Sequence, residues 1–155
     1  MDQLLSDQLI AAFPHLYRGW QGRDMREVWR TRQDFECGNG WFDLLWQLSA
    51  RLEARLSALP ETERSAYAPT NVKEKFGGLR FYLTRYTPEM ERAISQAEGQ
   101  SMRTCEECGK PGARLEAGGV IRTRCAEHAP PGSVPWEQGY DTLLPKPGHE
   151  GPEEP

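Results

Sequence analysis

The sequence predicts an α+β fold, in which a small helical and antiparallel-hairpin domain is followed by a compact C-terminal ribbon. Three observations support this prediction. Apolar residues recur at helical spacing over residues 41–59, residues 71–86 alternate apolar and polar side chains, and residues 104–129 contain two pairs of metal-type ligands. We therefore expect three segments: a helical and β-hairpin domain at 1–103, a Cys3His zinc ribbon at 104–129, and a Pro/Gly-rich acidic tail, partly disordered, at 130–155.

The helical period is clearest in residues 41–59. Apolar side chains return there every three or four residues, behind a Gly-Asn-Gly run and ahead of Pro60. We expect this segment to be the central helix, with one face in the core and the other in water. Its apolar positions are Trp41, Leu44, Leu45, Leu48, Leu52, Leu56 and Leu59, and its polar face carries Arg51, Glu53 and Arg55.

Two further helices are expected, one before and one after the central helix in the sequence. Residues 2–13 form an amphipathic segment that stops at Pro14. The third helix starts at Thr87 or Pro88, because Pro is favoured in the first helical turn, and it runs towards the ribbon. Residues 15–36 mix Gly, Arg and aromatic residues without a period, which predicts a loop with a helical turn or an edge strand.

Two glycine pairs mark hairpins. In residues 71–86, NVKEKFGGLRFYLTRY, the alternation has the period of a β-strand, and Gly77-Gly78 accepts the positive φ of a tight turn. A second short hairpin is expected where ARLEA and VIRTR flank Gly118-Gly119. Farther along, Val134–Leu144 is expected to lie over the body as an extended arm, anchored by Trp136 and Tyr140.

The ribbon reads TCEECGKPGARLEAGGVIRTRCAEHA and contains the metal-type ligands. Cys105 and Cys108 form one pair, and Cys125 and His128 form the other. A gap of two residues lets a tight turn present both members of a pair to one ion. Gly109 permits a sharp turn that brings backbone N–H groups towards the thiolates. The sequence therefore predicts one structural Zn²⁺ bound by these four residues.

A catalytic role for this zinc is disfavoured. A catalytic ion keeps one position open for water and usually has a general base nearby, whereas four protein ligands close the site here. Glu106, Glu107 and Glu127 lie between the ligands and are expected to point to solvent. The H-x-E and P-C-x-x-C pattern of zinc deaminases is absent from the sequence. The leftover Cys37 is expected to be a buried packing residue, with a reactive thiol as the alternative.

The run CEECGKPGARLEA with its later C-x-x-H resembles the zinc region of the DksA/TraR family of RNA-polymerase-binding regulators, over about residues 88–128. Members of that family carry a long coiled-coil hairpin. Here Pro60, Pro69 and the Gly77-Gly78 pair interrupt any such hairpin, and the last ligand is His128 rather than Cys. The resemblance therefore implies shared ribbon geometry and does not imply shared function.

A broader resemblance covers residues 35–128. FECGNGWFDLL, VKEKFGGLRFYL, a helix and TCEECGKPG with RTRCAEH occur in that order, and the combination is similar to a family of small uncharacterised bacterial and phage proteins. The resemblance implies a recurring fold with mobile-element associations. It implies no particular activity.

Charge and hydropathy restrict the compartment and the partners. No stretch approaches the roughly 18 apolar residues that span a bilayer, so no membrane partner is expected and the protein is predicted to be cytoplasmic. Thiols are reduced there, which favours metal binding over disulfides. The net charge is −4, and the acidic excess lies in residues 129–155. This segment has one basic residue, Lys146, and five acidic residues, Glu137, Asp141, Glu150, Glu153 and Glu154.

Two surfaces are candidates for partner binding. The hairpin combines cations with aromatic residues, as nucleic-acid readers do, but a sheet with one solvated face gives the same pattern. The arginine-rich loop before the central helix combines Arg and Trp, which are enriched at protein interfaces. The hairpin residues are Lys73, Lys75, Arg80, Tyr82 and Arg85, and the loop residues are Arg23, Arg26, Trp29 and Arg30.

These observations predict a non-enzymatic zinc-binding protein that docks on a host protein or a protein–nucleic-acid complex, as a phage- or prophage-encoded modulator or inhibitor. One alternative is a regulator that binds DNA or RNA directly through residues 71–86 and the ribbon. A second alternative is a cryptic hydrolase. The sequence contains no Gly-rich phosphate loop, no nucleophile elbow and no helical His pair to support it.

Overall fold

The computed structural model describes residues 1–21 and 34–136, and it has an α+β fold. The helices are α1 (Gln3–Ala12), α3 (Phe42–Ser57), α4 (Glu61–Arg64) and α5 (Pro88–Ser101), with 3-10 turns η1 (Arg18–Trp20), η2 (Asn39–Trp41) and η3 (Ala126–His128). The strands are β1 (Phe35–Glu36), β2 (Pro69–Lys75), β3 (Gly78–Leu83), β4 (Ala113–Ala117), β5 (Val120–Arg124) and β6 (Val134–Pro135).

The first sheet has the order β1-β2-β3. The predicted hairpin is its antiparallel β2–β3 pair, and β1 adds a short parallel edge strand to β2. The turn lies one residue earlier than expected, because Phe76 and Gly77 have positive φ, 52° and 74°, while Gly78 already pairs with Lys75. In the described parts of residues 15–36, both expected alternatives are found, a helical turn as η1 and an edge strand as β1, while residues 22–33 lie outside the described residues.

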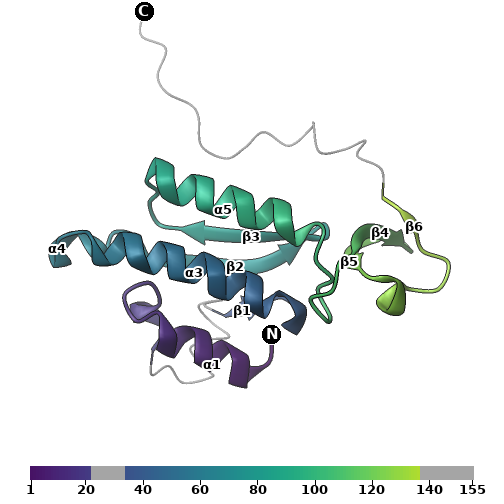
Figure 1. Cartoon of the computed structure of the whole chain (residues 1–155), viewed down its shortest axis with the longest axis horizontal. Helices are drawn as coiled ribbons and strands as arrows, with labels where there is room; N and C mark the ends of the chain where they lie inside the picture. Colours follow the sequence, from purple (N-terminus) through teal and green to yellow (C-terminus); the bar gives the residue numbers. More distant parts are fainter. Residues whose placement is uncertain (22–33, 137–155) are drawn as a thin grey trace, which may run out of the picture.

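Helices α3 and α5 lie side by side against one face of this sheet, and α1 packs below α3 (Figure 1). The resulting core consists of leucines and aromatic side chains from all these elements. Asp2 caps α1 by accepting a hydrogen bond from the Leu5 N–H, and Thr87 caps α5 through the Met90 N–H. Fully buried members of the core include Leu9, Leu16, Tyr17, Phe35, Trp41, Leu45, Leu48, Leu52, Leu56, Leu79, Phe81 and Met90.

The second sheet is small, with the order β5-β4-β6, and it lies beyond the β2–β3 turn (Figure 1). The glycines of the β4–β5 turn, Gly118 and Gly119, both have positive φ. The expected arm does not cover the body in its described part. Instead, β6 pairs with β4, and the Trp136 ring stacks on Arg114 at 4.1 Å. Tyr140 and the remainder of the arm lie outside the described residues.

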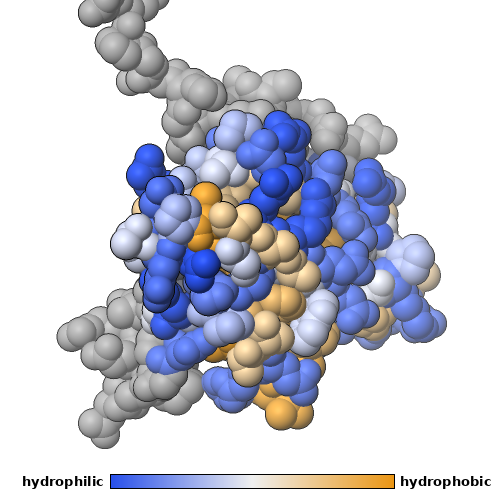
Figure 2. Space-filling view, turned by 60° about the vertical axis from the view of Figure 1, so that its left-hand side comes forward, coloured by the Kyte–Doolittle hydropathy of each residue, from blue (hydrophilic) through white to orange (hydrophobic). Residues whose placement is uncertain are grey.

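The surface of the described residues is mainly hydrophilic. Figure 2 shows one face, in which a band of hydrophobic residues crosses a largely hydrophilic surface. None of the helices in the described ranges has the length and apolar character needed to cross a bilayer. Large exposed apolar side chains come from separate elements: Leu4, Trp46, Phe76, Tyr86, Val120 and Val134.

Candidate metal centre

Four side chains with metal-ligating atoms converge at one point. They are Cys105, Cys108, Cys125 and His128, the four predicted ligands, and their ligand atoms all lie within 4.8 Å of one another. The first two belong to the turn after α5, Cys125 follows β5, and His128 ends η3. We call residues 1–101 the body and residues 104–136 the Cys3His module.

The distances between these atoms suit a tetrahedral ion. Zinc–sulfur bonds of about 2.3 Å in a tetrahedron place two sulfurs roughly 3.8 Å apart. The Cys108 and Cys125 Sγ atoms are 3.7 Å apart. The His128 Nδ1 lies 3.7 Å from the Cys105 Sγ and 3.3 Å from the Cys125 Sγ. The arrangement is therefore consistent with a single zinc ion bound through Nδ1 and three thiolates.

Short backbone contacts hold the two ligand pairs together. Gly109 has φ of 74°, and its N–H donates to the Cys105 carbonyl at 2.9 Å, which closes the first turn as expected. The Glu106 N–H donates to the Thr123 carbonyl at 3.0 Å and ties this turn to β5. At Gly112, a Cβ atom would lie 2.8 Å from the Arg124 carbonyl oxygen. The hairpin therefore returns Cys125 to the first pair at close backbone distance.

The backbone also favours ionised ligands. Burial opposes ionisation of Cys105, but N–H groups of Cys125, Cys108 and Glu107 point at its sulfur and lower its pKa to about 6. The pKa of Cys125 is likewise lowered: burial opposes ionisation there too, and the His128 side chain and N–H outweigh it. Metals bind thiolates rather than thiols. Although the Lys110 N–H favours the Cys108 thiolate, burial and the neighbouring Cys105 and Cys125 sulfurs raise the pKa of Cys108. The surroundings therefore favour thiolates at Cys105 and Cys125.

The CGNGW loop, residues 37–41 just before α3, packs directly on the first ligand pair. The Gly40 N–H donates to the Glu106 carbonyl at 2.8 Å, and the indole N–H of Trp41 donates to the Thr104 carbonyl at 2.8 Å. A Cβ atom on Gly40 would lie 2.3 Å from the Cys105 carbonyl oxygen and 2.6 Å from the Cys108 N. Only a residue without a side chain permits this approach.

The expectation that Glu106 points to solvent is wrong. Its side chain is buried, accepts a hydrogen bond from the Gly38 N–H at 2.9 Å, and pairs with Arg124 at 2.9 Å. Both partners are largely buried, with side chains 8% and 13% exposed. The neighbouring Glu107 is exposed, as expected, and also contacts Arg124. Glu106 thus joins the CGNGW loop to the module, and each of its carboxylate oxygens already accepts a hydrogen bond.

The β2–β3 turn supplies a second contact with the module. The Thr123 hydroxyl, which is buried in β5, donates to the Gly77 carbonyl. Arg122 pairs with Glu74 of β2, whose side chain is 11% exposed. The module is therefore attached to the body at two places, the CGNGW loop and the hairpin turn. The sequence predicted neither contact. The Gly-Asn-Gly run at residues 38–40 marks the CGNGW loop but does not indicate what the loop packs against.

Cys37 lies in the CGNGW loop but is not one of the clustered ligands. It is 8% exposed, and burial raises the pKa of its thiol to about 12. A buried, protonated thiol is a poor nucleophile. The expected packing role is supported.

The structure brings only some of the predicted partner-binding residues close together. On β2 and β3, Lys73 pairs with Arg80 on the face of the sheet opposite the buried Val72–Phe81 pair, and Tyr82 lies two pairs further on, on the same face as Arg80. Lys75 and Arg85 are exposed at opposite ends of the hairpin. Glu36 stands beside Lys73 on the same face. Arg23, Arg26, Trp29 and Arg30 lie outside the described residues.

Comparisons of the chain with protein-family models, with curated proteins and with solved structures found no match. The site is therefore interpreted from its own geometry.

Proposed function

We propose that this protein binds one structural zinc ion through Cys105, Cys108, Cys125 and His128, and that it acts by docking on another protein rather than by catalysis. The single observation that carries the zinc assignment is the convergence of these four ligand atoms to within 4.8 Å. Four protein ligands complete a zinc tetrahedron and form a closed ribbon site. The ion then substitutes for an apolar core in the module.

Two features support a docking role. The carboxylate beside the first ligand, Glu106, is committed to Gly38 and Arg124 and so is not available as a general base. The module is also attached to the body at two places, the CGNGW loop and the β2–β3 turn, so its position relative to the β2–β3 hairpin is preorganised. Rigid surfaces lose less entropy on binding. The motif resemblance suggests a phage- or prophage-encoded modulator of a host protein.

Zinc content tests the first half of the proposal. Elemental analysis of the full chain should give one zinc per molecule, and Cys108→Ser should reduce this stoichiometry strongly. Lys110→Gln, which changes an exposed residue in the same turn, should leave it unchanged. A folded wild-type protein without metal would refute the proposal.

A protein partner is tested by affinity purification followed by reconstitution of the purified pair. The complex should form at moderate salt and weaken with Arg80→Glu, because Arg80 lies on the solvent face of the hairpin. Arg103→Glu alters the charge equally at an exposed position outside the hairpin and serves as the control. Equal effects of the two variants would argue against this face.

Direct nucleic-acid binding is the second candidate, and the juxtaposition of Lys73, Arg80 and Tyr82 favours it. Phosphates would contact the cations, and a base would stack on the tyrosine. Glu36, which is paired with Lys73 across β1 and β2, reduces the local positive charge. This favours a protein partner over a nucleic acid. Electrophoretic shift assays decide between them. Affinity for DNA or RNA that falls steeply with salt and is lost in Lys73→Gln/Arg80→Gln would support the second candidate.

A further inference from the structure

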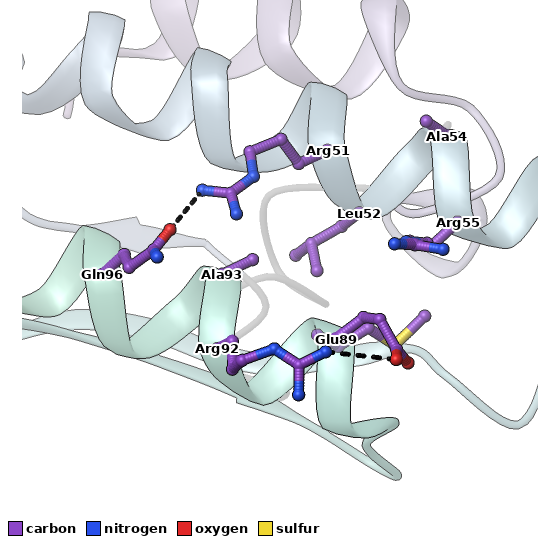
Figure 3. A pocket seen from close by; sticks show the side chains of 9 residues that line it. Arg51, Leu52, Ala54, Arg55, Glu89, Arg92, Ala93 and Gln96 are labelled. Atoms are coloured by element: carbon purple, nitrogen blue, oxygen red, sulfur yellow. Dashed lines mark hydrogen bonds and ion pairs between the residues drawn. The ribbon is translucent and has the colours of Figure 1, made fainter.

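A groove of about 350 Å³ runs between α3 and α5, on the side of the body away from the metal ligands. Figure 3 shows Arg51 and Arg55 reaching from α3 towards α5, with Arg92 and Glu89 on the opposite wall. The floor is apolar but well covered, since Leu52, Met90 and Ala93 are all buried. Recognition in this groove therefore depends mainly on the charged groups along its rim.

The rim is cationic. It carries three arginines, Arg51, Arg55 and Arg92, against one acidic residue, Glu89. All three arginines are exposed. Residues 1–128 carry equal numbers of acidic and basic side chains, so the groove is a local excess of positive charge on a neutral background. A concave surface lined with one sign of charge attracts ligands of the opposite sign.

The existing partners of these arginines are weak. Arg51 donates to the neutral amide of Gln96 at 2.9 Å, and Arg55 interacts electrostatically with Glu89 across the groove. Arg92 pairs with Glu89 at 3.2 Å, but these side chains are 65% and 41% exposed. Exposed pairs of this type contribute little to stability. A carboxylate ligand can therefore take them over at small cost.

We propose that this groove binds an acidic segment of the protein partner, whose carboxylates contact Arg51 and Arg55. This inference rests on the proposed docking function and names the chemistry of the partner. Arg51 and Arg55 are four residues apart on α3, which separates their attachment points by about 6 Å along the helix axis. Carboxylates four residues apart on a helix have the same spacing, so each can pair with one guanidinium.

The probe is a fluorescein-labelled helical peptide that carries glutamates four residues apart, with alanines between them. Its affinity for the full-length, zinc-loaded protein is measured by fluorescence anisotropy at low and moderate salt. We expect saturable binding that weakens with salt, and about tenfold weaker binding of the matched peptide with glutamine in place of glutamate.

Paired variants locate the site. Arg51→Gln/Arg55→Gln should weaken binding about tenfold, whereas Arg18→Gln/Arg103→Gln, with the same loss of charge at exposed positions outside the groove and the hairpin, should change it less than about twofold. Arg51→Lys/Arg55→Lys keeps the charge and should lie between the two. Because these side chains are exposed, the variants should keep the wild-type melting temperature, which is measured alongside.

Four outcomes would overturn the proposal. The first is the absence of saturable binding, and the second is an equal effect of the groove variant and the Arg18→Gln/Arg103→Gln control, which would indicate diffuse attraction. The third is much tighter binding after removal of residues 137–155, which would assign the groove to the chain's own acidic tail. The fourth is concentration-dependent dimerisation that the groove variants abolish, which would assign it to a second copy. The zinc assays and the complex reconstituted through Arg80 do not depend on any of these results.

Discussion

The body buries a continuous core of leucines and aromatic side chains, whereas the Cys3His module buries only Cys105, Glu106, Thr123 and Cys125, all of its residues being described. Two of these four, Cys105 and Cys125, belong to the Cys3His cluster. The other two are polar and bond the module internally and to the body. The body can thus fold by the hydrophobic effect, while the module depends on its ligands and on a few polar contacts.

Cysteine shows the same difference on a smaller scale. Burial in the body raises the pKa of Cys37 to about 12, while N–H groups of the module overcome burial and lower that of Cys105 to about 6. The body thus keeps the Cys37 thiol neutral, whereas the module stabilises the Cys105 thiolate. The following experiments separate the two regions, beginning with the largest effect.

Removal of zinc should unfold the module and leave the body folded. Structural zinc sites contribute about 10 kcal/mol or more to the folding of comparable small units. After addition of a chelator, hydrogen exchange measured by mass spectrometry should accelerate throughout residues 104–128. Exchange in α3 and α5 should remain slow. Loss of protection in both regions at once would show that the protein unfolds as a single cooperative unit. It would contradict the view that the body folds independently of the module.

Leu48→Ala should have the converse effect. Leu48 is 2% exposed in the centre of α3, and leucine truncation in a packed core costs about 2–5 kcal/mol. The free energy of unfolding from urea titration should fall by this amount. The zinc stoichiometry of the folded fraction should not change. Ala50→Ser, at an exposed position of the same helix, is the control.

Gly40→Ala tests the contact between the two regions. The new Cβ would overlap backbone atoms of Cys105, Cys108 and Gly109, which must move apart. We expect a loss of about 1–3 kcal/mol and weaker zinc retention in competition with a chromophoric chelator. Gly19→Ala introduces the same methyl group where nothing lies within 4 Å, and it should be nearly neutral. Similar behaviour of the two variants would exclude a tight interface at Gly40.

Alkaline pH should destabilise the body through Cys37. Its thiol ionises at an ordinary pKa of 9.0 in the unfolded chain and at about 12 in the folded one, so the folded state retains the proton longer. Stability from this group is complete below pH 9 and declines above it, by at most about 1.4 kcal/mol per pH unit. Urea titrations of wild type and Cys37→Ser at pH 8 and pH 10 measure the difference. A parallel decline in both proteins would contradict the assignment.

Local sequence signals predicted most elements and all four clustered residues. The leucine period located α3, Pro88 located the start of α5, and the ligand spacing located the cluster. These features depend on residues close in sequence. The contact between the CGNGW loop and the first ligand pair depends on backbone atoms about 65 residues apart, and no local pattern encodes it.

The same limit explains the errors. Glu106 resembles a surface residue because its neighbours are charged, yet the fold places Gly38 and Arg124 within hydrogen-bonding distance of its carboxylate. Glu53 also looked like a solvated residue of the polar helix face. Instead, it accepts hydrogen bonds from the His15 and Leu16 N–H groups, at 3.1 and 2.8 Å. Burial of a charged side chain is decided by distant donors that periodicity does not reveal.

The Trp41 indole spans the two regions, since its ring is completely buried in the body while its N–H bonds to Thr104 at the entrance to the module. Indole emission shifts in wavelength when the N–H group loses a carbonyl partner and meets water. The protein therefore contains its own optical reporter of the junction. Of its five tryptophans, Trp41 can be isolated spectroscopically by subtracting the emission of Trp41→Phe. Metal binding could then be followed in real time without an added dye.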